Sequence, residues 1–320
     1  MRAVQITDHS GTPKLAQIDR PTPQSGEVLV NIAACGLNFA DLLMSQGKYQ
    51  ERPALPTVLG MEPAGRIEAL GADVESLRPG DRIAVFSGQN GLADYGVFAA
   101  NRCVPLPDNM DFIDAAAFQI AYGTSHVALD YKARLQPGET LLVLGAAGGV
   151  GLTAVEIGKL MGATVIACAR GAEKLAICKE AGADHVIDSE TQDIREVVKS
   201  LGGADVVYDA VGGDQFEAAF RACNPDARAL LIGFASGKLP QIKPNHMLVK
   251  NISVIGLYWG AYLNFRPEVV TDSMRQLFAW YAAGKLKPHV SHTLPLDQAL
   301  DALDLLRSRK STGKVVVTMG

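Results

Sequence analysis

Alternating apolar and polar positions mark the first hundred residues of the chain. Residues 27–32, 65–70 and 81–86 each alternate with the period of two that is typical of half-buried strands. Turn-forming residues separate them, as in Arg78-Pro79-Gly80-Asp81. Short strands with such regular turns predict a mostly-β domain, either a partly open barrel or a sandwich.

The pattern changes near residue 111. A long helix is predicted over 111–133, with Asp111 and Asp114 in its first turn, and strands and helices then alternate as far as residue 256. The predicted strands are 140–144, 163–167, 205–209, 229–233 and 252–256, and the predicted helices are 149–161, 172–180 and 213–222. This βαβα order predicts an α/β fold with a doubly wound parallel sheet, covered by helices on both faces.

The alternation ends after Gly256. Helices are predicted over 267–284 and 296–309, and a last strand over 314–318. We expect this tail to pack against the first domain. The expected organisation is a discontinuous domain of residues 1–122 and 257–320 around a second domain of residues 123–256.

Composition agrees with two soluble domains and excludes several classes of protein. The chain has 320 residues, 48% hydrophobic and 20% charged, with a net charge of −4. Its basic residues are dispersed, which argues against a nucleic-acid partner. No apolar run is long enough to span a membrane, and the first residues alternate like a strand rather than a signal peptide, so we expect a cytoplasmic protein. The five cysteines form no CxxC pair, as expected of free thiols.

A glycine-rich turn follows the predicted strand 140–144. It reads Gly145-Ala146-Ala147-Gly148-Gly149-Val150-Gly151 and runs directly into a helix. Glycines here let the backbone approach a pyrophosphate, and the helix N-terminus offers N–H groups to the anion. The residues from Ala147 to Gly151 are therefore predicted to bind a dinucleotide. The alternative is a tight turn without a ligand.

The end of the next strand indicates which dinucleotide is bound. An Asp or Glu about 20 residues after the turn would bind the ribose hydroxyls of NAD. This chain has Arg170 there, and Lys174 one helical turn later. A guanidinium can bind a 2′-phosphate with two charge-assisted hydrogen bonds, whereas a carboxylate would repel it. We therefore predict NADPH as the cofactor, the alternative being that both cations are ordinary surface charges.

Four segments carry a resemblance to a known family. They are residues 35–41 (CGLNFAD), residues 59–65 (LGMEPAG), the glycine turn and Ser311-Thr312-Gly313-Lys314. With them the chain resembles the zinc-independent quinone oxidoreductase family of the medium-chain dehydrogenase/reductase superfamily. The resemblance implies a GroES-like catalytic domain, an NADPH-binding Rossmann domain, a cleft between them, NADPH as hydride donor and a homodimer.

The same resemblance bears on zinc. The zinc alcohol dehydrogenases have Cys where this chain has Asn38, and His where it has Met61, and the region of their third ligand, near Phe118-Gln119, has neither residue type here. Asn and Met are poor ligands for Zn²⁺, so no metal site is expected. Without a Lewis acid, the chemistry left is hydride transfer to a conjugated acceptor such as a quinone or an enone.

Three residues match positions that line the active-site cleft of this family: Asn38, Asp41 and Tyr49. Asn38 could donate its amide N–H to the acceptor oxygen, and Tyr49 could donate a hydrogen bond or a proton. The alternative for Asn38 and Asp41 is turn capping, and for Tyr49 an ordinary amphipathic contact. Solvent can supply the proton in this family, so positioning can account for much of the catalysis.

The resemblance also assigns cofactor contacts beyond the turn. Thr124 is expected near the nicotinamide amide, Phe234 over the cofactor and Arg309 near the adenosine phosphate. Tyr258 clusters with Trp259 after the predicted strand 252–256, and we expect it either to contact the nicotinamide or the substrate or to lie at a dimer surface. The loop expected to cover the cofactor contributes Gly233, Phe234, Ser236 and Gly237. Ser189 departs from the family, which often has Tyr at that position to hold the adenosine end.

The function expected from these features is that of an NADPH:quinone oxidoreductase, by hydride or one-electron steps. One alternative is an NADPH-dependent reductase of enones or 2-enoyl-CoA thioesters, for which Lys243 and Lys250 flank a weak candidate site for the CoA phosphates. A further alternative is a non-catalytic NADPH-binding protein. The expected partners are a small-molecule substrate and a second copy of the chain, with no nucleic acid and no membrane.

Overall fold

The computed structural model describes residues 1–8 and 12–320, in two units. The first unit comprises Met1–Ile120 and Pro288–Gly320, and the second comprises Ala121–Lys287. The first unit is therefore built from two separate stretches of the chain. Among the described residues, no helix has the length and apolar composition needed to cross a membrane.

Two antiparallel-rich sheets form most of the first unit. In the described ranges, the larger has the strand order β15-β16-β3-β5-β6-β8, with β7 also paired to β3, and the smaller has the order β2-β1-β4. The strands are β1 Arg2–Ile6, β2 Lys14–Gln17, β3 Glu27–Gly36, β4 Thr57–Val58, β5 Glu62–Leu70, β6 Arg82–Val85, β7 Tyr95–Ala99, β8 Cys103–Pro105, β15 Val290–Pro295 and β16 Lys314–Thr318. The helices are α1 Phe39–Ser45, α2 Phe112–Ala116 and α11 Ala299–Arg307.

The long strand β3 brings distant segments of this unit together. At its C-terminal end, Gly36 pairs with Glu62 of β5 on one side and with Val316 of β16 on the other. Gly36 also lies against α2, because a Cβ built on it would come within 2.0 Å of the Ala116 carbonyl oxygen. The residues that follow β3, begin β5 and begin β16 therefore meet at one end of the sheet.

A parallel sheet covered by helices forms the second unit. Its strand order is β11-β10-β9-β12-β13-β14 in the part of the chain that the structure describes. The strands are β9 Thr140–Leu144, β10 Thr164–Ala169, β11 His185–Asp188, β12 Ala204–Asp209, β13 Cys223–Leu231 and β14 Ser253–Gly256. The helices are α3 Gln119–His126 (which begins in the first unit), α4 Gly149–Leu160, α5 Ala172–Glu180, α6 Ile194–Ser200, α7 Gly213–Ala222, α8 Pro244–Lys250, α9 Tyr262–Phe265 and α10 Pro267–Ala282.

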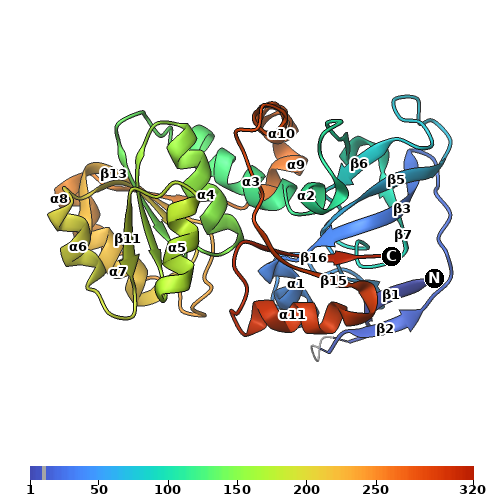
Figure 1. Ribbon diagram of the computed structural model, residues 1–320, viewed down its shortest axis with the longest axis horizontal. Coiled ribbons are helices and arrows are strands. Elements are labelled where there is room, and N and C mark those ends of the chain that lie inside the picture. The colour runs from blue at the N-terminus through green and yellow to red at the C-terminus, as the bar shows by residue number, and fades with distance from the viewer. Residues whose placement is uncertain (9–11) are drawn as a thin grey trace. The chain divides into compact units, whose positions relative to one another are not determined.

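The strand order reverses direction beside β9. The chain passes from β9 through α4 to β10 in one direction, and β12 then pairs with the other side of β9. Right-handed crossovers place α4 and α5 on one face of the sheet and α6 and α7 on the other, as Figure 1 shows. The carboxyl end of β9 is thus a topological switch point, where open α/β sheets bind their ligands. The predicted α/β fold with a doubly wound parallel sheet is confirmed.

The predicted helix over 111–133 is wrong as a single element. The chain forms α2, breaks at Ala117 and Phe118, continues as α3 and ends in a π-helical turn, Val127–Lys132. Asp111 caps α2 by accepting a hydrogen bond from the Asp114 N–H (2.8 Å). The break has a physical reason, because the Ile120 N–H donates to the Glu62 carboxylate (2.9 Å) instead of continuing a helical ladder.

The expected domain boundary after β14 also differs from the observed units. Residues 257–287 belong to the second unit, and the chain joins the first unit only from Pro288. The reason is that α9 and α10 pack against the helical segment after Ala121: His126 Nδ1 is 2.9 Å from the Ser273 hydroxyl, and Arg266 bonds the Tyr131 hydroxyl. His126 also packs edge-on against the Trp280 ring, with centroids 5.2 Å apart.

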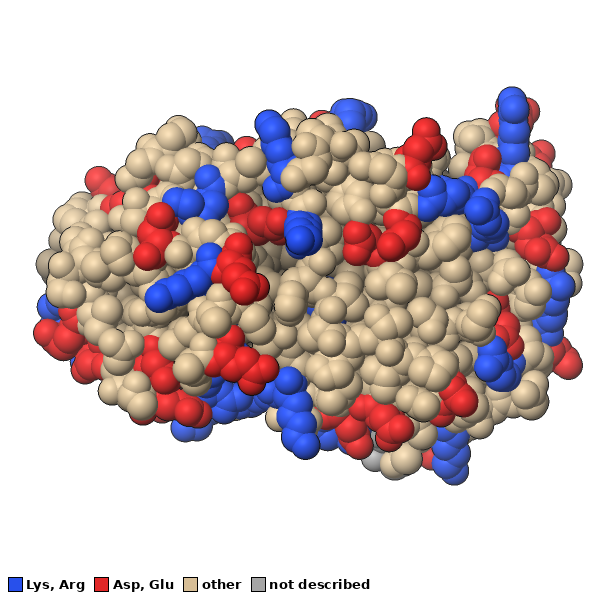
Figure 2. Space-filling view, in the orientation of Figure 1, with Lys and Arg blue, Asp and Glu red and all other residues tan. Residues whose placement is uncertain are grey.

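Acidic and basic side chains are interspersed on the face drawn in Figure 2. The surface of the protein also carries ion pairs, for example Lys159 with Asp184 (2.8 Å) and Arg275 with Asp272 (2.7 Å). Pairs this exposed contribute little to stability and keep the surface locally neutral.

Candidate active site and cofactor-binding site

Three glycines of the turn differ in what the backbone requires of them. Gly145 adopts a φ of +69°, which turns the chain sharply at the end of β9. A Cβ on Gly151 would lie 2.2 Å from the Gly145 carbonyl oxygen, so only glycine lets α4 pack this closely on the turn. Gly148, the residue before α4, has an ordinary φ of −82°, and its nearest such contact is 3.4 Å away. Backbone packing therefore requires Gly151 but leaves Gly148 open to another role.

The first turn of α4 fits a phosphate ligand. Its N-cap, Gly148, has no side chain to accept the N–H groups of Gly149, Val150 and Gly151, and the first turn carries no acid. These N–H groups and the helix dipole together favour an anion. Ala147 is buried beside them. The residues predicted from the sequence to bind a dinucleotide, Ala147 to Gly151, thus form one cradle at the switch point of the sheet.

Arg170 lies at the carboxyl end of β10, where sheets of this kind bind the adenosine ribose of a dinucleotide. It follows β10 directly, and its side chain is 43% exposed, with Nη1 4.0 Å from Glu190 Oε1. Asp188 holds this corner together by accepting from the N–H groups of Gly171 (3.3 Å) and Glu190 (3.1 Å). Glu190 was not predicted from the sequence. A 2′-phosphate bound at Arg170 would compete with the Glu190 carboxylate. The ion pair between Glu190 and Arg170 is weak, because it is long and screened by solvent.

The loop expected to cover the cofactor is docked on the turn after β12. The N–H groups of Ala235 and Ser236 donate to the carbonyls of Ala210 (3.1 Å) and Val211 (2.9 Å), and Gly237 closes the loop with an N–H bond to Phe234 (2.8 Å). Phe234 is 41% exposed. The predicted residues Gly233, Phe234, Ser236 and Gly237 therefore form one ordered turn beside the carboxyl ends of the strands.

Asp209 at the end of β12 supports that turn. It is fully buried and accepts hydrogen bonds from the N–H groups of Val211 (2.8 Å) and Gly212 (2.9 Å). Burial raises the pKa of its carboxyl to about 6, and the bonds from Gly212 and Val211 oppose that rise. Sequence reasoning treated Asp209 only as a strand residue. The sequence feature that could have singled it out is an acidic residue at the end of a mostly apolar parallel strand.

Asp209 makes stability depend on pH. The folded chain holds this proton more tightly than the unfolded chain, so the cost of ionising it is absent below about pH 4 and complete above about pH 6. A rise of about two pKa units corresponds to roughly 3 kcal/mol. We expect the unfolding free energy to fall across this window, and Asp209→Asn, which keeps the Oδ1 acceptor, to reduce the fall. Urea unfolding at several pH values measures both slopes, and equal slopes would contradict the assignment.

Thr124 and Tyr258 both lie in the second unit. Thr124 is buried on α3, next to Ser125, whose hydroxyl donates to the Val150 carbonyl (2.9 Å) in the first turn of α4. Tyr258 precedes Trp259, whose ring packs on α3 so closely that a Cβ on Gly123 would lie 2.8 Å from it. Thr124 is thus next to a residue bonded to the first turn of α4, and Tyr258 is next to a residue packed on α3. Lys174 lies part-buried on α5, and Arg309 lies exposed after α11 in the first unit, with a φ of +57°.

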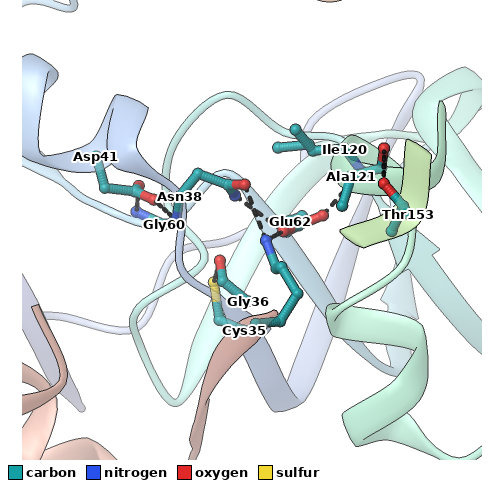
Figure 3. A network of polar contacts seen from close by, with 10 residues as sticks. Cys35, Gly36, Asn38, Asp41, Gly60, Glu62, Ile120, Ala121 and Thr153 are labelled. Atoms are coloured by element: carbon teal, nitrogen blue, oxygen red, sulfur yellow. Dashed lines mark hydrogen bonds and ion pairs between the residues drawn. The ribbon is translucent and has the colours of Figure 1, made fainter. Parts of the chain in front are cut away.

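A buried polar centre forms in the first unit at the end of β3. Lys314 makes an ion pair with Glu62, and their side chains are 5% and 0% exposed. Asn38 joins both of them: its Oδ1 accepts from Lys314 Nζ (2.8 Å), and its Nδ2 donates to Glu62 Oε1 (2.8 Å). Figure 3 shows this network, with the Ile120 N–H on the other oxygen of Glu62. Both charges are shielded from water and satisfied by each other.

Glu62 and Lys314 were not predicted as site residues. They were noted only inside segments that carry the family resemblance, and they are far apart in the sequence. The available signal was a lysine directly before Val315, Val316 and Val317 in a strand, since a buried lysine needs a partner. The partner becomes visible only when β16 and β5 pair with the two sides of β3.

The carboxylate of Asp41 bonds the backbone of the segment that carries Asn38. Asp41 is fully buried, and its carboxylate accepts from the N–H groups of Asn38 (2.8 Å) and Gly60 (3.2 Å). Burial raises the pKa of Asp41 to about 7, although the Asn38 N–H and Lys314 both favour the ionised form. Asp41 thus anchors the loop that carries Asn38. Tyr49 lies part-buried in the bend after α1.

The remaining positions named for zinc ligands are buried in the first unit. Met61, Phe118 and Gln119 are at most 2% exposed. Within the described ranges, no three His, Cys, Asp or Glu residues are grouped as metal ligands would be. The positive charge beside Asn38 belongs to the Lys314 ammonium.

Known proteins resemble this chain over nearly its whole length. Residues 24–108 match the family model "Alcohol dehydrogenase GroES-like domain", and residues 149–280 match "Zinc-binding dehydrogenase". A "Quinone oxidoreductase-like protein 2 homolog" of Nematostella vectensis is 42% identical, over 99% of this chain and 88% of its own length. "Quinone oxidoreductase-like protein 2" of Bos taurus is 37% identical, over 94% of this chain and 88% of its own length.

Solved structures agree with these relatives. The quinone oxidoreductase of Thermus thermophilus, described with its NADPH complex, superposes with a TM-score of 0.88 at 32% identity, covering 100% of both chains. That of Escherichia coli, complexed with NADPH, superposes with a TM-score of 0.92 at 28% identity, again covering 100% of both chains. Together with the residues at the positions of the zinc ligands, these similarities show that the chain belongs to the zinc-independent quinone oxidoreductase family of the medium-chain dehydrogenase/reductase superfamily.

Proposed function

We propose that this NADPH-dependent oxidoreductase reduces quinones or closely related conjugated carbonyls. The observation that carries the proposal is the buried centre in which an amide, Asn38, stands where zinc dehydrogenases have a cysteine ligand. An amide can donate a hydrogen bond to a carbonyl oxygen but cannot activate an unconjugated alcohol as a metal does. The related enzymes of Thermus thermophilus and Escherichia coli, both described with NADPH, support the same assignment.

Bound NADPH supplies a hydride, which carries two electrons, and a quinone that accepts it needs one further proton to become a hydroquinone. The chain's own residues have three tasks. The cradle from Ala147 to Gly151 holds the pyrophosphate, and Arg170 holds the 2′-phosphate. The Asn38 amide donates a hydrogen bond to the acceptor oxygen as negative charge develops on it, and water supplies the proton.

A reductase of enoyl-CoA thioesters is the second candidate, and one observation counts against it. Such an enzyme needs free cations for the CoA phosphates, and Lys243 and Lys250 were the candidates. The Lys250 ammonium donates instead to the carbonyls of Cys223 (2.7 Å) and Arg221 (3.3 Å). It is therefore engaged in capping backbone groups at the end of α7.

Turnover with a panel of acceptors tests the proposal. NADPH oxidation is followed by absorbance with 1,4-benzoquinone, 9,10-phenanthrenequinone, a simple enone and crotonyl-CoA, each against a reaction without enzyme. We expect the highest kcat/KM with a quinone. A rate with crotonyl-CoA far above every quinone would instead identify an enoyl reductase. Tight NADPH binding without turnover of any acceptor would identify a non-catalytic binding protein.

The edge strand β14 supports the expected homodimer. β14 is the last strand of the parallel sheet, so one side of its backbone is available to another strand. Leu248 and Val249 on the neighbouring helix α8 are 79% and 77% exposed. An exposed strand edge flanked by apolar side chains suits pairing with a second copy of the chain. Sedimentation velocity measures the oligomeric state.

A further inference from the structure

The side-chain amide of Asn38 is held at both of its ends by groups of opposite charge. Its oxygen accepts from the Lys314 ammonium (2.8 Å), and its nitrogen donates to the Glu62 carboxylate (2.8 Å). Lys314 and Glu62 also bond each other directly. The three side chains form a closed triangle, shown in part in Figure 3.

This arrangement permits only one orientation of the amide. A flipped Asn38 would turn its N–H groups toward the ammonium, which has no acceptor, and its oxygen toward the carboxylate, which has no donor. Two attractive contacts would become repulsive ones. The ion pair is almost fully buried, so water does little to screen that repulsion.

One donor of the amide is left over in that orientation. An amide nitrogen carries two hydrogens, and Glu62 takes one of them. Among residues 1–8 and 12–320, the second has no hydrogen-bond partner, and Asn38 is only part-buried, unlike Glu62 and Lys314. The triangle therefore fixes the orientation of a remaining N–H on a side chain that is itself only part-buried.

Each corner of the triangle is also tied to the backbone of its unit. The Glu62 carboxylate accepts the Ile120 N–H (2.9 Å), and Asp41 accepts the Asn38 N–H (2.8 Å). Lys314 opens β16, which pairs with β3 two residues further on. The position of the amide is thus set by several separate segments of the chain rather than by its own loop.

We propose that Glu62 and Lys314 are positioning residues for catalysis, which hold the Asn38 amide so that its remaining N–H faces the carbonyl oxygen of the acceptor. The inference rests on the proposed function. The N–H stabilises the oxygen as it gains negative charge and remains on Asn38, because the proton that completes the reduction comes from water. Glu62 and Lys314 act through Asn38 and do not touch the acceptor.

A double-mutant cycle on kcat tests whether the pair acts through Asn38. Asn38→Ala removes the donor, and we expect a loss of about 100-fold in kcat. Glu62→Gln combined with Lys314→Met removes both charges together, so that neither is left buried without a partner. We expect this pair of changes to lower kcat by at least about 10-fold in the native background, and by less than about two-fold when Asn38 is already alanine.

Two further readouts separate positioning from damage to the fold. The Glu62→Gln, Lys314→Met variant should bind NADPH with the Kd of the wild type, both with and without Asn38→Ala. Cofactor fluorescence measures this Kd. The matched control removes another ion pair of the same unit, Arg2 with Asp94 (2.7 Å), as Arg2→Met with Asp94→Asn. That control should lower the melting temperature without lowering kcat. If the Glu62 and Lys314 double variant does not fold, Lys314→Arg takes its place in the cycle, since it keeps the charge but changes the donor geometry.

The outcomes are distinct. A wild-type chain that turns over none of the acceptors overturns the proposed function and this inference with it. Turnover by the wild type, together with losses that multiply in the combined variant, overturns the inference alone. So does an unchanged kcat in the variant that lacks both charges. Losses that do not multiply, with an unchanged Kd for NADPH, support it.

Discussion

Replacing Gly151 with alanine is expected to weaken NADPH binding at least ten-fold and to lower the melting temperature of the protein. The added Cβ would lie 2.2 Å from the Gly145 carbonyl oxygen and 2.8 Å from its carbon, both of them backbone atoms that no rotamer change can move. Overpacking of this kind typically costs about 1–3 kcal/mol, and 1.4 kcal/mol is a factor of ten in Kd. The N-terminus of α4 must shift, and with it the N–H groups that we propose hold the pyrophosphate. Fluorescence titration and thermal unfolding measure the two effects.

Gly148→Ala is the matched control, because it separates packing from ligand approach. Gly148 has an ordinary φ of −82°, and its added Cβ would meet nothing closer than 3.4 Å. We expect its melting temperature to stay near that of the wild type. A loss of NADPH affinity in this variant, without a loss of melting temperature, then reports the approach of the phosphates to the backbone. A Gly151→Ala protein that binds NADPH like the wild type would contradict the role given to the turn.

Arg170→Ala is expected to lower the preference for NADPH over NADH by about 10- to 100-fold in kcat/KM, mainly through NADPH. Hydrogen bonds to charged groups contribute about 1.5–3 kcal/mol, and no other guanidinium follows β10 directly. NADH lacks the phosphate, so its kcat/KM should change little. Steady-state kinetics with both cofactors and one quinone measure the ratio.

Arg221→Ala is the control for charge alone. Arg221 is an exposed arginine in the last turn of α7, at the edge of the sheet opposite the carboxyl ends of the strands. Removing it changes the net charge equally but should leave the cofactor preference unchanged. Glu190→Gln should instead strengthen NADPH binding, because it removes the carboxylate 4.0 Å from Arg170. An Arg170→Ala enzyme with the wild-type ratio would show that the 2′-phosphate is held elsewhere.

Much of the second unit could be predicted from local pattern. The predicted helices 172–180 and 213–222 and the predicted strand 140–144 match α5, α7 and β9 to the residue. Apolar runs bounded by glycine specify where such elements begin and end, so neighbours along the chain suffice. The pattern failed at 111–133, where the carboxylate of Glu62, from a different strand, takes the amide that a continuous helix would have used.

The sequence by itself determined the family of oxidoreductases and NADPH as the cofactor. A glycine turn between strand and helix, Arg170 after the next strand, and Asn38 and Met61 where zinc ligands would stand are all local facts about residue types. Each can be read without knowing what packs against it, because the chemistry depends on the kind of residue at that place.

Only the tertiary structure decided which groups hold the Asn38 side chain. Glu62 and Lys314 are separated by 252 residues, and they meet because β5 and β16 both pair near the end of β3. The register of those strands, and the glycine at position 36 that lets α2 approach, place one buried charge on each side of the amide. The physical reason is that an isolated charge is expensive to bury, so Lys314 and Glu62 are stable inside the unit only together.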